Sequence, residues 1–421
     1  MAKLSEVLKN PNFFFLWVGQ IISQFGDRLT QMALIGLIYK RAPGSAYELA
    51  KLFLFVVIPV FVVGPVAGAY TDRWSRKYTM VISDLIRGFL ILGIIFYMKI
   101  VPTLKPIYPV YIIVFLAFSV ARFFVPAKMA IIPDLVAQDK LLEANSLINT
   151  TGMIAAALGF GLGGILISLP SVGVKGGLII DATTFFVSAA LILFMRLNKP
   201  QALIKEDIYA FGRHVKDIIV SSVFKEISDG IRYIFTHRKM YFIIALLFFL
   251  WSGIGASYVV MIVFIQNVLS NATKYVGILA MLFGAGLFFG SIIYGRFGQR
   301  FSKRGAIFLS LSLGGLFLVQ FVLLVELFKN IYVAGILSFI FGASISPLMI
   351  SPNAIVHELI PDELRGRIFS SLEAVMHLAF LIFMFLAALL ARYVSGGIVL
   401  LVSGGIYIAA GFAGILLKKK L

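Results

Sequence analysis

The sequence contains no cysteine and little charge. Among its 421 residues there are four histidines, and Asp, Glu, Lys and Arg together make up 13%. Without cysteine the chain cannot form disulfides, thiol nucleophiles or cysteine-ligated metal sites, and four scattered histidines argue against a catalytic zinc site. A soluble domain carries roughly twice this share of charge. The composition therefore excludes an ordinary water-soluble protein.

Long apolar runs fill the chain instead. Hydrophobic residues make up 60% of the sequence, and the mean hydropathy is +1.00. A helix needs about 20 apolar residues to cross the hydrocarbon core of a membrane. Twelve runs of about this length occur, none with the period-2 alternation of a barrel strand. They are Phe13–Tyr39, Glu48–Tyr70, Tyr78–Met98, Tyr108–Pro126, Ala144–Leu169, Gly177–Leu197, Tyr241–Leu269, Tyr275–Phe297, Ala306–Glu326, Tyr332–Pro352, Ile368–Val394 and Ile398–Leu417. The sequence predicts an all-α membrane protein with twelve transmembrane helices.

The basic residues indicate the orientation. Most of the 37 Lys and Arg residues lie in the two termini and in the loops after even-numbered spans. Cytoplasmic loops carry such an excess of Lys and Arg. We therefore expect a multi-pass protein of the inner (cytoplasmic) cell membrane with both termini in the cytoplasm. The net charge of +18 then belongs to loops beside the bilayer, and no nucleic-acid partner is expected.

The chain divides into two similar halves. The longest polar stretch, Asn198–Met240, contains an amphipathic helix pattern and separates six spans from six. Gly68–Lys77 is similar in sequence to Gly295–Arg304, and Ala130–Leu135 is similar to Ala354–Leu359. The two pairs of segments are separated by nearly the same number of residues, as in an internal repeat. The prediction is an N-terminal six-helix bundle (residues 1–197), a cytoplasmic linker (198–240) and a pseudo-symmetric six-helix bundle (241–421). Duplicated bundles are typical of alternating-access carriers.

The loop after the second span resembles the signature loop of the major facilitator superfamily, G-x-L-a-D-R-x-G-R-[RK]. The matching positions are Gly68, Asp72, Arg73, Arg76 and Lys77. Tyr70 and Ser75 depart from it, where Leu and Gly are expected. The resemblance implies the major facilitator fold, with this loop as a conformational gate between spans.

Further motifs narrow the resemblance. Pro126–Val136 and Leu141–Leu147 are similar to the subgroup containing macrolide efflux proteins, the enterobactin exporter and lysophospholipid transporters. Ala155–Gly164 resembles the superfamily's antiporter motif, which is associated with export, so the resemblance favours an exporter. Phe160 stands in place of the proline of that motif. The lysine at position 128, where Arg is commoner in the subgroup, is similar to the residue in the lysophospholipid transporters.

The resemblance implies a secondary active transporter, a monomer in the lipid bilayer, that exports amphipathic drug-like molecules in exchange for protons (or Na⁺). A lysophospholipid (flippase-type) or siderophore carrier is the alternative. No G-x-x-x-x-G-K-[ST] loop occurs, so nucleotide hydrolysis by that route is excluded, and no cofactor is expected. A membrane-embedded enzyme would need clustered His, Asp or Ser in loops at one face, which the sequence lacks.

A polar stripe in the first span is the main candidate site. Gln20, Gln24, Asp27 and Gln31 recur at spacings that place them on one helical face. Because an ionisable group at mid-membrane depth is costly in lipid, the stripe should face a wettable interior. We expect Asp27 to bind the coupling proton or a cationic part of the substrate. The alternative is a structural ion pair with Arg28 or Arg122.

Other spans add lesser candidates. Glu373 and His377 share a helical face and could relay protons, unless Glu373 only pairs with loop arginines such as Arg365 or Arg367. Asp84 and Arg87 are expected to neutralise each other near the inner surface.

Arg122 lies four residues before Pro126, and drug–proton antiporters of the superfamily place an arginine four residues before a glycine in this helix. The likeness implies that Arg122 interacts with Asp27 or binds an anionic substrate, and structural pairing is the alternative. Trp251 and Tyr258 are expected to line a cavity for apolar or cationic substrates. The alternative is that they only pack helices or face lipid, as most aromatic residues do in a chain with 14% Phe, Trp and Tyr.

Overall fold

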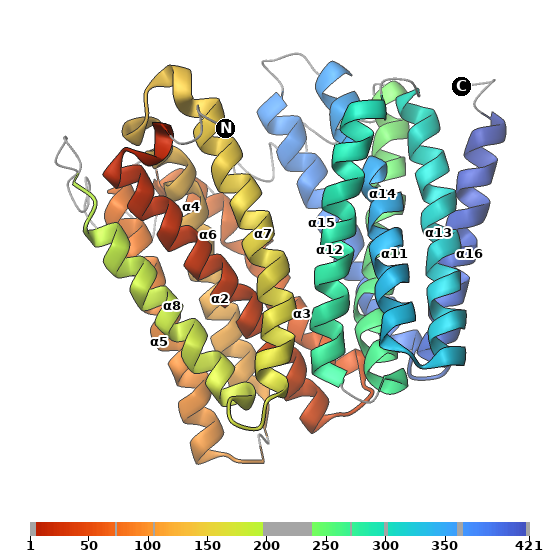
Figure 1. The fold of residues 1–421 in the computed structure, drawn as a ribbon, viewed down its shortest axis with the longest axis horizontal. Helices are drawn as coiled ribbons and strands as arrows, with labels where there is room; N and C mark the ends of the chain where they lie inside the picture. The colour runs from red at the N-terminus through yellow and green to blue at the C-terminus, as the bar shows by residue number, and fades with distance from the viewer. Residues whose placement is uncertain are drawn as a thin grey trace. The chain divides into compact units, whose positions relative to one another are not determined.

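The computed structural model describes residues 6–71, 74–103, 106–196, 238–269, 272–298, 302–359 and 365–417 (Figure 1). These residues form helices and no strand. The helices of the first half are α2 (Pro11–Arg41), α3 (Ala46–Val62), α4 (Gly64–Thr71), α5 (Arg76–Ile100), α6 (Tyr108–Leu135), the 3₁₀ turn η1 (Gln138–Lys140), α7 (Leu141–Ser168) and α8 (Gly173–Leu193). Those of the second half are α11 (Arg238–Val268), α12 (Ala272–Phe297), α13 (Lys303–Phe328), α14 (Ile331–Leu359), α15 (Arg365–Leu390) and α16 (Gly396–Leu417).

Ten helices of the described chain are long and apolar enough to cross a membrane. Two further predicted spans complete the set: α2, which carries the polar stripe, and the consecutive helices α3 and α4. The all-α prediction with twelve spanning segments is confirmed. By its internal contacts the chain separates into two compact units, residues 1–37 with 52–223, and residues 38–51 with 224–421.

Each unit is a bundle of closely packed helices. In the first unit α5 packs against α6 and α8, and α4 packs against α6. In the second unit α12 packs against α14, α13 against α14 and α16, and α11 against α15 and α16. The predicted linker, apart from Arg238–Met240 at the start of α11, lies outside the described residues.

Proline explains where the helices differ from the predicted spans. The second span is not one helix: α3 ends at Val62 and α4 begins at Gly64, directly before Pro65. Proline donates no backbone hydrogen bond, so Pro65 fits the first turn of α4, where that bond is not needed, and cannot continue the bonding of α3. By contrast, α6 continues through Pro126 to Leu135, and α14 continues through Pro352 to Leu359. Neighbouring groups in a membrane bundle can satisfy the backbone that a proline leaves free. The predicted span end at Pro126 was therefore wrong, since the apolar span continues to Leu135, whereas the predicted end at Pro352 agrees with the apolar span Ile331–Pro352.

Small residues bring α2 very close to its neighbours. A Cβ atom at Gly159 of α7 would lie 2.8 Å from Cβ of Arg28 and 2.9 Å from the carbonyl oxygen of Phe25. On another side of α2, a Cβ atom at Gly26 would overlap Thr184 and Asp181 of α8. The glycine-rich stretch of α7 therefore packs directly on α2, which is the usual role of small residues in membrane helices.

Glycines also set the α12–α14 contact in the second unit. A Cβ atom at Gly286 would overlap the carbonyl oxygen of Phe339, and one at Gly342 would overlap that of Phe283. The two backbones touch at these glycines, so neither position has room for a side chain.

We expect Gly286→Ala to destabilise the protein by about 1–3 kcal/mol, because backbone atoms must separate to admit the methyl group. Thermal unfolding of the detergent-purified protein measures this. Gly405→Ala in α16 is the control: no atom lies within 4 Å of the added Cβ, so its stability should stay the same or rise. Equal stability of Gly286→Ala and wild type would contradict the close contact.

Candidate functional site

The polar stripe lies on the continuous helix α2. Gln20 is buried, whereas Gln24, Asp27 and Gln31 are half-buried. The Gln24 amide nitrogen donates to the side-chain oxygen of Gln20 at 3.5 Å. Because α2 is unbroken from Pro11 to Arg41, the four residues share one face, as their spacing predicts.

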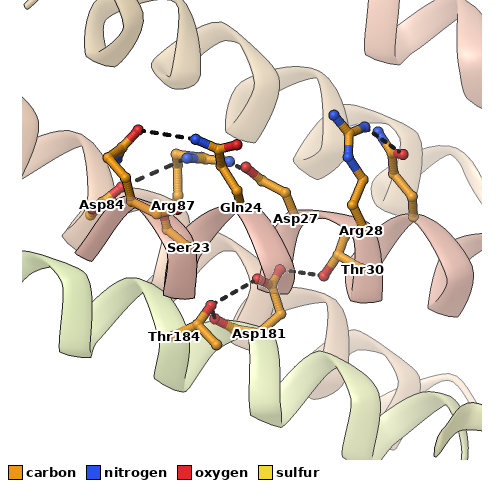
Figure 2. A network of polar contacts seen from close by, with 11 residues as sticks. Ser23, Gln24, Asp27, Arg28, Thr30, Asp84, Arg87, Asp181 and Thr184 are labelled. Atoms are coloured by element: carbon orange, nitrogen blue, oxygen red, sulfur yellow. Dashed lines mark hydrogen bonds and ion pairs between the residues drawn. The ribbon is translucent and has the colours of Figure 1, made fainter. Parts of the chain in front are cut away.

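Asp27 forms an ion pair with Arg87 of α5 (Figure 2). The other terminal nitrogen of Arg87 lies 3.7 Å from a carboxylate oxygen of Asp84, and the guanidinium carbon lies 4.0 Å from the Phe185 ring centroid of α8. The expected partners of Asp27, Arg28 and Arg122, are therefore not the ones observed here. The expected Asp84–Arg87 pair exists, but Asp27 shares its arginine.

Asp181 of α8 adds a third carboxylate, which lies in none of the sequence motifs and was not predicted. Its side chain is fully buried. The Thr30 hydroxyl donates to one of its carboxylate oxygens, and the Thr184 hydroxyl lies 3.2 Å from the other (Figure 2). Asp181 is the sole acidic residue in the predicted span Gly177–Leu197. The cost of a carboxylate in an apolar span, which singled out Asp27, could have identified it.

The carboxylates outnumber the cation between them. Asp27, Asp84 and Asp181 come from three helices, and Arg87 interacts electrostatically with all of them. Lys128 of α6 lies within electrostatic range of Asp27. Asp84 and Asp181 are fully buried, whereas 31% of the Asp27 side chain is exposed. Asp27 is thus the accessible member of the cluster.

Arg28 points away from this cluster. Its Nη1 donates to the side-chain oxygen of Gln31 at 2.9 Å, and its guanidinium carbon lies 5.3 Å from the Phe160 ring centroid of α7. Phe160 occupies the place of the proline in the antiporter-like motif. Adjacent residues of α2 therefore contact different helices: Asp27 pairs with Arg87 of α5, and Arg28 lies over Phe160 of α7.

The basic end of the signature loop binds helix ends of the first unit. Arg76 donates to the Ala130 carbonyl oxygen and to the Asp134 carboxylate of α6, both at 2.8 Å. Lys77 donates to the carbonyl oxygens of Leu193 and Met195, also at 2.8 Å. A cation at a helix C-terminus is favourable for the exposed carbonyl groups and the helix dipole.

The other signature positions are less fully described. Gly68 lies within α4, and Asp72 and Arg73 lie outside the described residues. The gating role of the loop stays a prediction.

The candidates in the second unit lie beside one another. The Nδ1 atom of His377 in α15 is 2.8 Å from the main-chain oxygen of Glu373, whose side chain is exposed. The His377 ring lies 5.8 Å from the Trp251 ring of α11, and Tyr258 lies 5.6 Å from Phe380, centroid to centroid. The predicted proton relay and the predicted aromatic contacts therefore share one place on α11 and α15. In the first unit, Arg122 is half-buried in α6, one turn before Pro126.

We expect Arg87→Gln to destabilise the protein by about 3 kcal/mol, because it leaves Asp27 and Asp84 without their shared counter-ion. Adding Asp27→Asn should recover about 1 kcal/mol or more of this loss. Thermal unfolding of the two single variants and the double variant measures this coupling.

Glu6 and Lys140 provide the control pair, since they form an ion pair at the surface. The same cycle with Glu6→Gln and Lys140→Gln should show little coupling. A coupling for Asp27 and Arg87 as small as that of the control pair would contradict the shared ion pair.

Comparison with known proteins agrees with the helical architecture. Solved structures with the same fold include a bacterial homologue of the iron transporter ferroportin in an inward-facing state, with a TM-score of 0.72 at 16% identity over 96% of this chain and 98% of that chain. The nucleoside transporter NupG has a TM-score of 0.71 at 11% identity over 97% of this chain and 99% of that chain. At these identities the likeness concerns the fold alone.

Sequence relatives span nearly the whole chain. Macrolide efflux protein A of Streptococcus pyogenes is 23% identical over 382 residues, covering 89% of this chain and 88% of the relative. "Putative bacilysin exporter BacE" of Bacillus subtilis is 27% identical over 380 residues, covering 88% of this chain and 86% of the relative. The family model of the Major Facilitator Superfamily matches residues 16–270 and 254–420. The chain therefore belongs to the major facilitator superfamily and is a multi-pass membrane transporter.

Proposed function

We propose that this transporter exports amphipathic drug-like molecules in exchange for protons, by alternating access, from a cytoplasmic membrane in which both termini face the cytoplasm. The relatives named for macrolide and bacilysin export support the direction and the substrate class. The excess of Lys and Arg in the termini and even-numbered loops supports the orientation. The protein acts as a carrier, not as an enzyme.

The observation that carries proton coupling is the sharing of Arg87 by three carboxylates. Separated charges in the interior of a membrane protein are costly, so a cluster with surplus carboxylates favours a bound proton. Asp27 is the exposed member and therefore the natural entry point. Asp84 and Asp181 are the fully buried members of the cluster.

The cluster suggests how a proton would move helices. With Asp27 ionised, its ion pair with Arg87 links α2 to α5. When Asp27 takes a proton, Arg87 keeps only Asp84, which lies on its own helix. The tie between α2 and α5 is then weakened, and its formation and release alternate with proton loss and uptake.

The remaining predicted residues have supporting roles in this proposal. Within the second unit, Trp251 and Tyr258 are the candidates for contact with the apolar part of a substrate, and Glu373 and His377 are the candidates for a proton relay. Gln20, Gln24 and Gln31 supply neutral hydrogen-bonding groups beside Asp27. Arg76 and Lys77 hold the signature loop on the ends of α6 and α8.

Asp27→Asn should abolish proton exchange, because the amide keeps the shape of the side chain but cannot take up a proton. The measurement uses proteoliposomes containing a pH-sensitive dye, with proton movement recorded on addition of erythromycin, cationic dyes or a lysolipid. Wild type should move protons when a substrate is added, and Asp27→Asn should match empty liposomes. Asp139→Asn is the control, since Asp139 is an exposed carboxylate in η1.

Proton movement by Asp27→Asn at the wild-type rate would refute the role of Asp27. Substrate transport by wild type that continues unchanged after the proton gradient is collapsed would refute proton coupling. If only the lysolipid were carried in that case, the flippase-type alternative would replace the proposal.

A further inference from the structure

Arg28 carries a positive charge in the middle of a membrane helix, yet its contacts are neutral. It donates to the amide oxygen of Gln31 and lies over the ring of Phe160. Its Nε atom is buried and has no hydrogen-bond partner among the described residues. An intramembrane arginine normally pairs with an acid or with backbone carbonyl groups. The guanidinium of Arg28 therefore has donor capacity that the described protein groups do not use.

The nearest acid in the sequence is already engaged. Asp27 forms its ion pair with Arg87, on the α5 side of α2. Within the part of the chain that the structure describes, Arg28 has no ion-pair partner. Its charge is therefore not balanced by the carboxylate cluster described above.

The surroundings hold the guanidinium in a defined orientation. A Cβ atom at Gly159 would lie 2.8 Å from the Arg28 Cβ atom, so the side-chain stem of Arg28 passes close to the α7 backbone. The Phe160 ring lies beneath the guanidinium, and Gln31 holds one of its terminal nitrogens. A planar guanidinium that is held in place and has free N–H groups matches the two oxygens of a carboxylate.

We propose that Arg28, with Phe160 and Gln31, forms an anion subsite that binds a carboxylate group of the transported molecule. This inference deepens the proposed export of amphipathic molecules, on which it rests, by naming the substrate class: amphipathic molecules that carry a free carboxylate, including zwitterions. The aromatic ring beneath the guanidinium provides the apolar contact for the part of the substrate next to the carboxylate.

A matched pair of dyes tests the subsite directly. Rhodamine B has a free carboxylate, and its ethyl ester has the same cationic ring system without that charge. Binding of each dye to the full-length protein in nanodiscs is measured by fluorescence anisotropy at neutral pH, without a proton gradient. Wild type should bind rhodamine B about tenfold more tightly than the ester, as expected for a charge-assisted hydrogen bond.

Variants assign this preference to Arg28. Arg28→Gln should lower the affinity for rhodamine B to that of the ester and leave the ester affinity unchanged. Arg28→Lys should keep part of the preference, because it retains the charge but loses the planar fork. Phe160→Leu should also reduce the preference, while keeping an apolar residue against α2. Arg196→Gln is the matched control, since the Arg196 side chain is exposed at the end of the first half.

Equal affinity of wild type for the two dyes, or absence of rhodamine B binding, would overturn the subsite. So would a preference that survives Arg28→Gln, or one that Arg196→Gln removes to the same extent. Displacement of rhodamine B by lysophosphatidylglycerol but not by octanoate would also overturn it, by assigning the anion site to a lipid phosphate. The binding assay uses no proton gradient, so it tests the anion subsite even if proton exchange is not observed. Equal affinities for the two dyes would refute the anion subsite without contradicting proton exchange.

Discussion

The organisation of the first unit depends on one constraint: a carboxylate that lies within a membrane-spanning helix needs a counter-charge or a proton there. Arg87 meets this constraint for Asp27 of α2 and Asp84 of its own helix α5, with Asp181 of α8 in electrostatic range. The three helices must therefore converge on one guanidinium. Gly26 permits this convergence, because a side chain at that position would overlap Asp181 and Thr184.

The two sides of α2 consequently differ in chemistry. Toward α5 and α8 lies an acidic cluster that shares a single arginine, and this side suits proton binding. Toward α7 lies Arg28, held by Phe160 and Gln31 and free of any acid among the described residues, and this side suits an anionic group. In the proposed mechanism, α2 thus carries the proton-binding carboxylate and the substrate-binding cation as sequence neighbours, so that binding at one would affect the other through the position of α2.

The sequence predicts the fold better than the site. Ten spans follow from hydropathy alone, because insertion into lipid is a property of each segment. The other two, α2 and the pair α3 and α4, are apolar runs that are interrupted by a polar stripe or by a proline. The shared face of Gln20, Gln24, Asp27 and Gln31 follows from helical spacing within one element. The partner of Asp27 does not, since only packing decides whether Arg28, Arg87 or Arg122 reaches it. Sequence alone likewise does not tell that the second span breaks before Pro65 while α6 continues past Pro126, since both stretches contain a proline.

The most direct test of this account is the protonation of the cluster itself. Infrared difference spectroscopy of the protein in nanodiscs follows the C=O stretching band of protonated carboxyl groups as pH is changed or rhodamine B is added. The account predicts a band that responds to both changes in wild type, and a response that is reduced when Asp27 is replaced by Asn. An identical response in wild type and in Asp27→Asn would show that Asp27 takes up no proton, and would contradict the account.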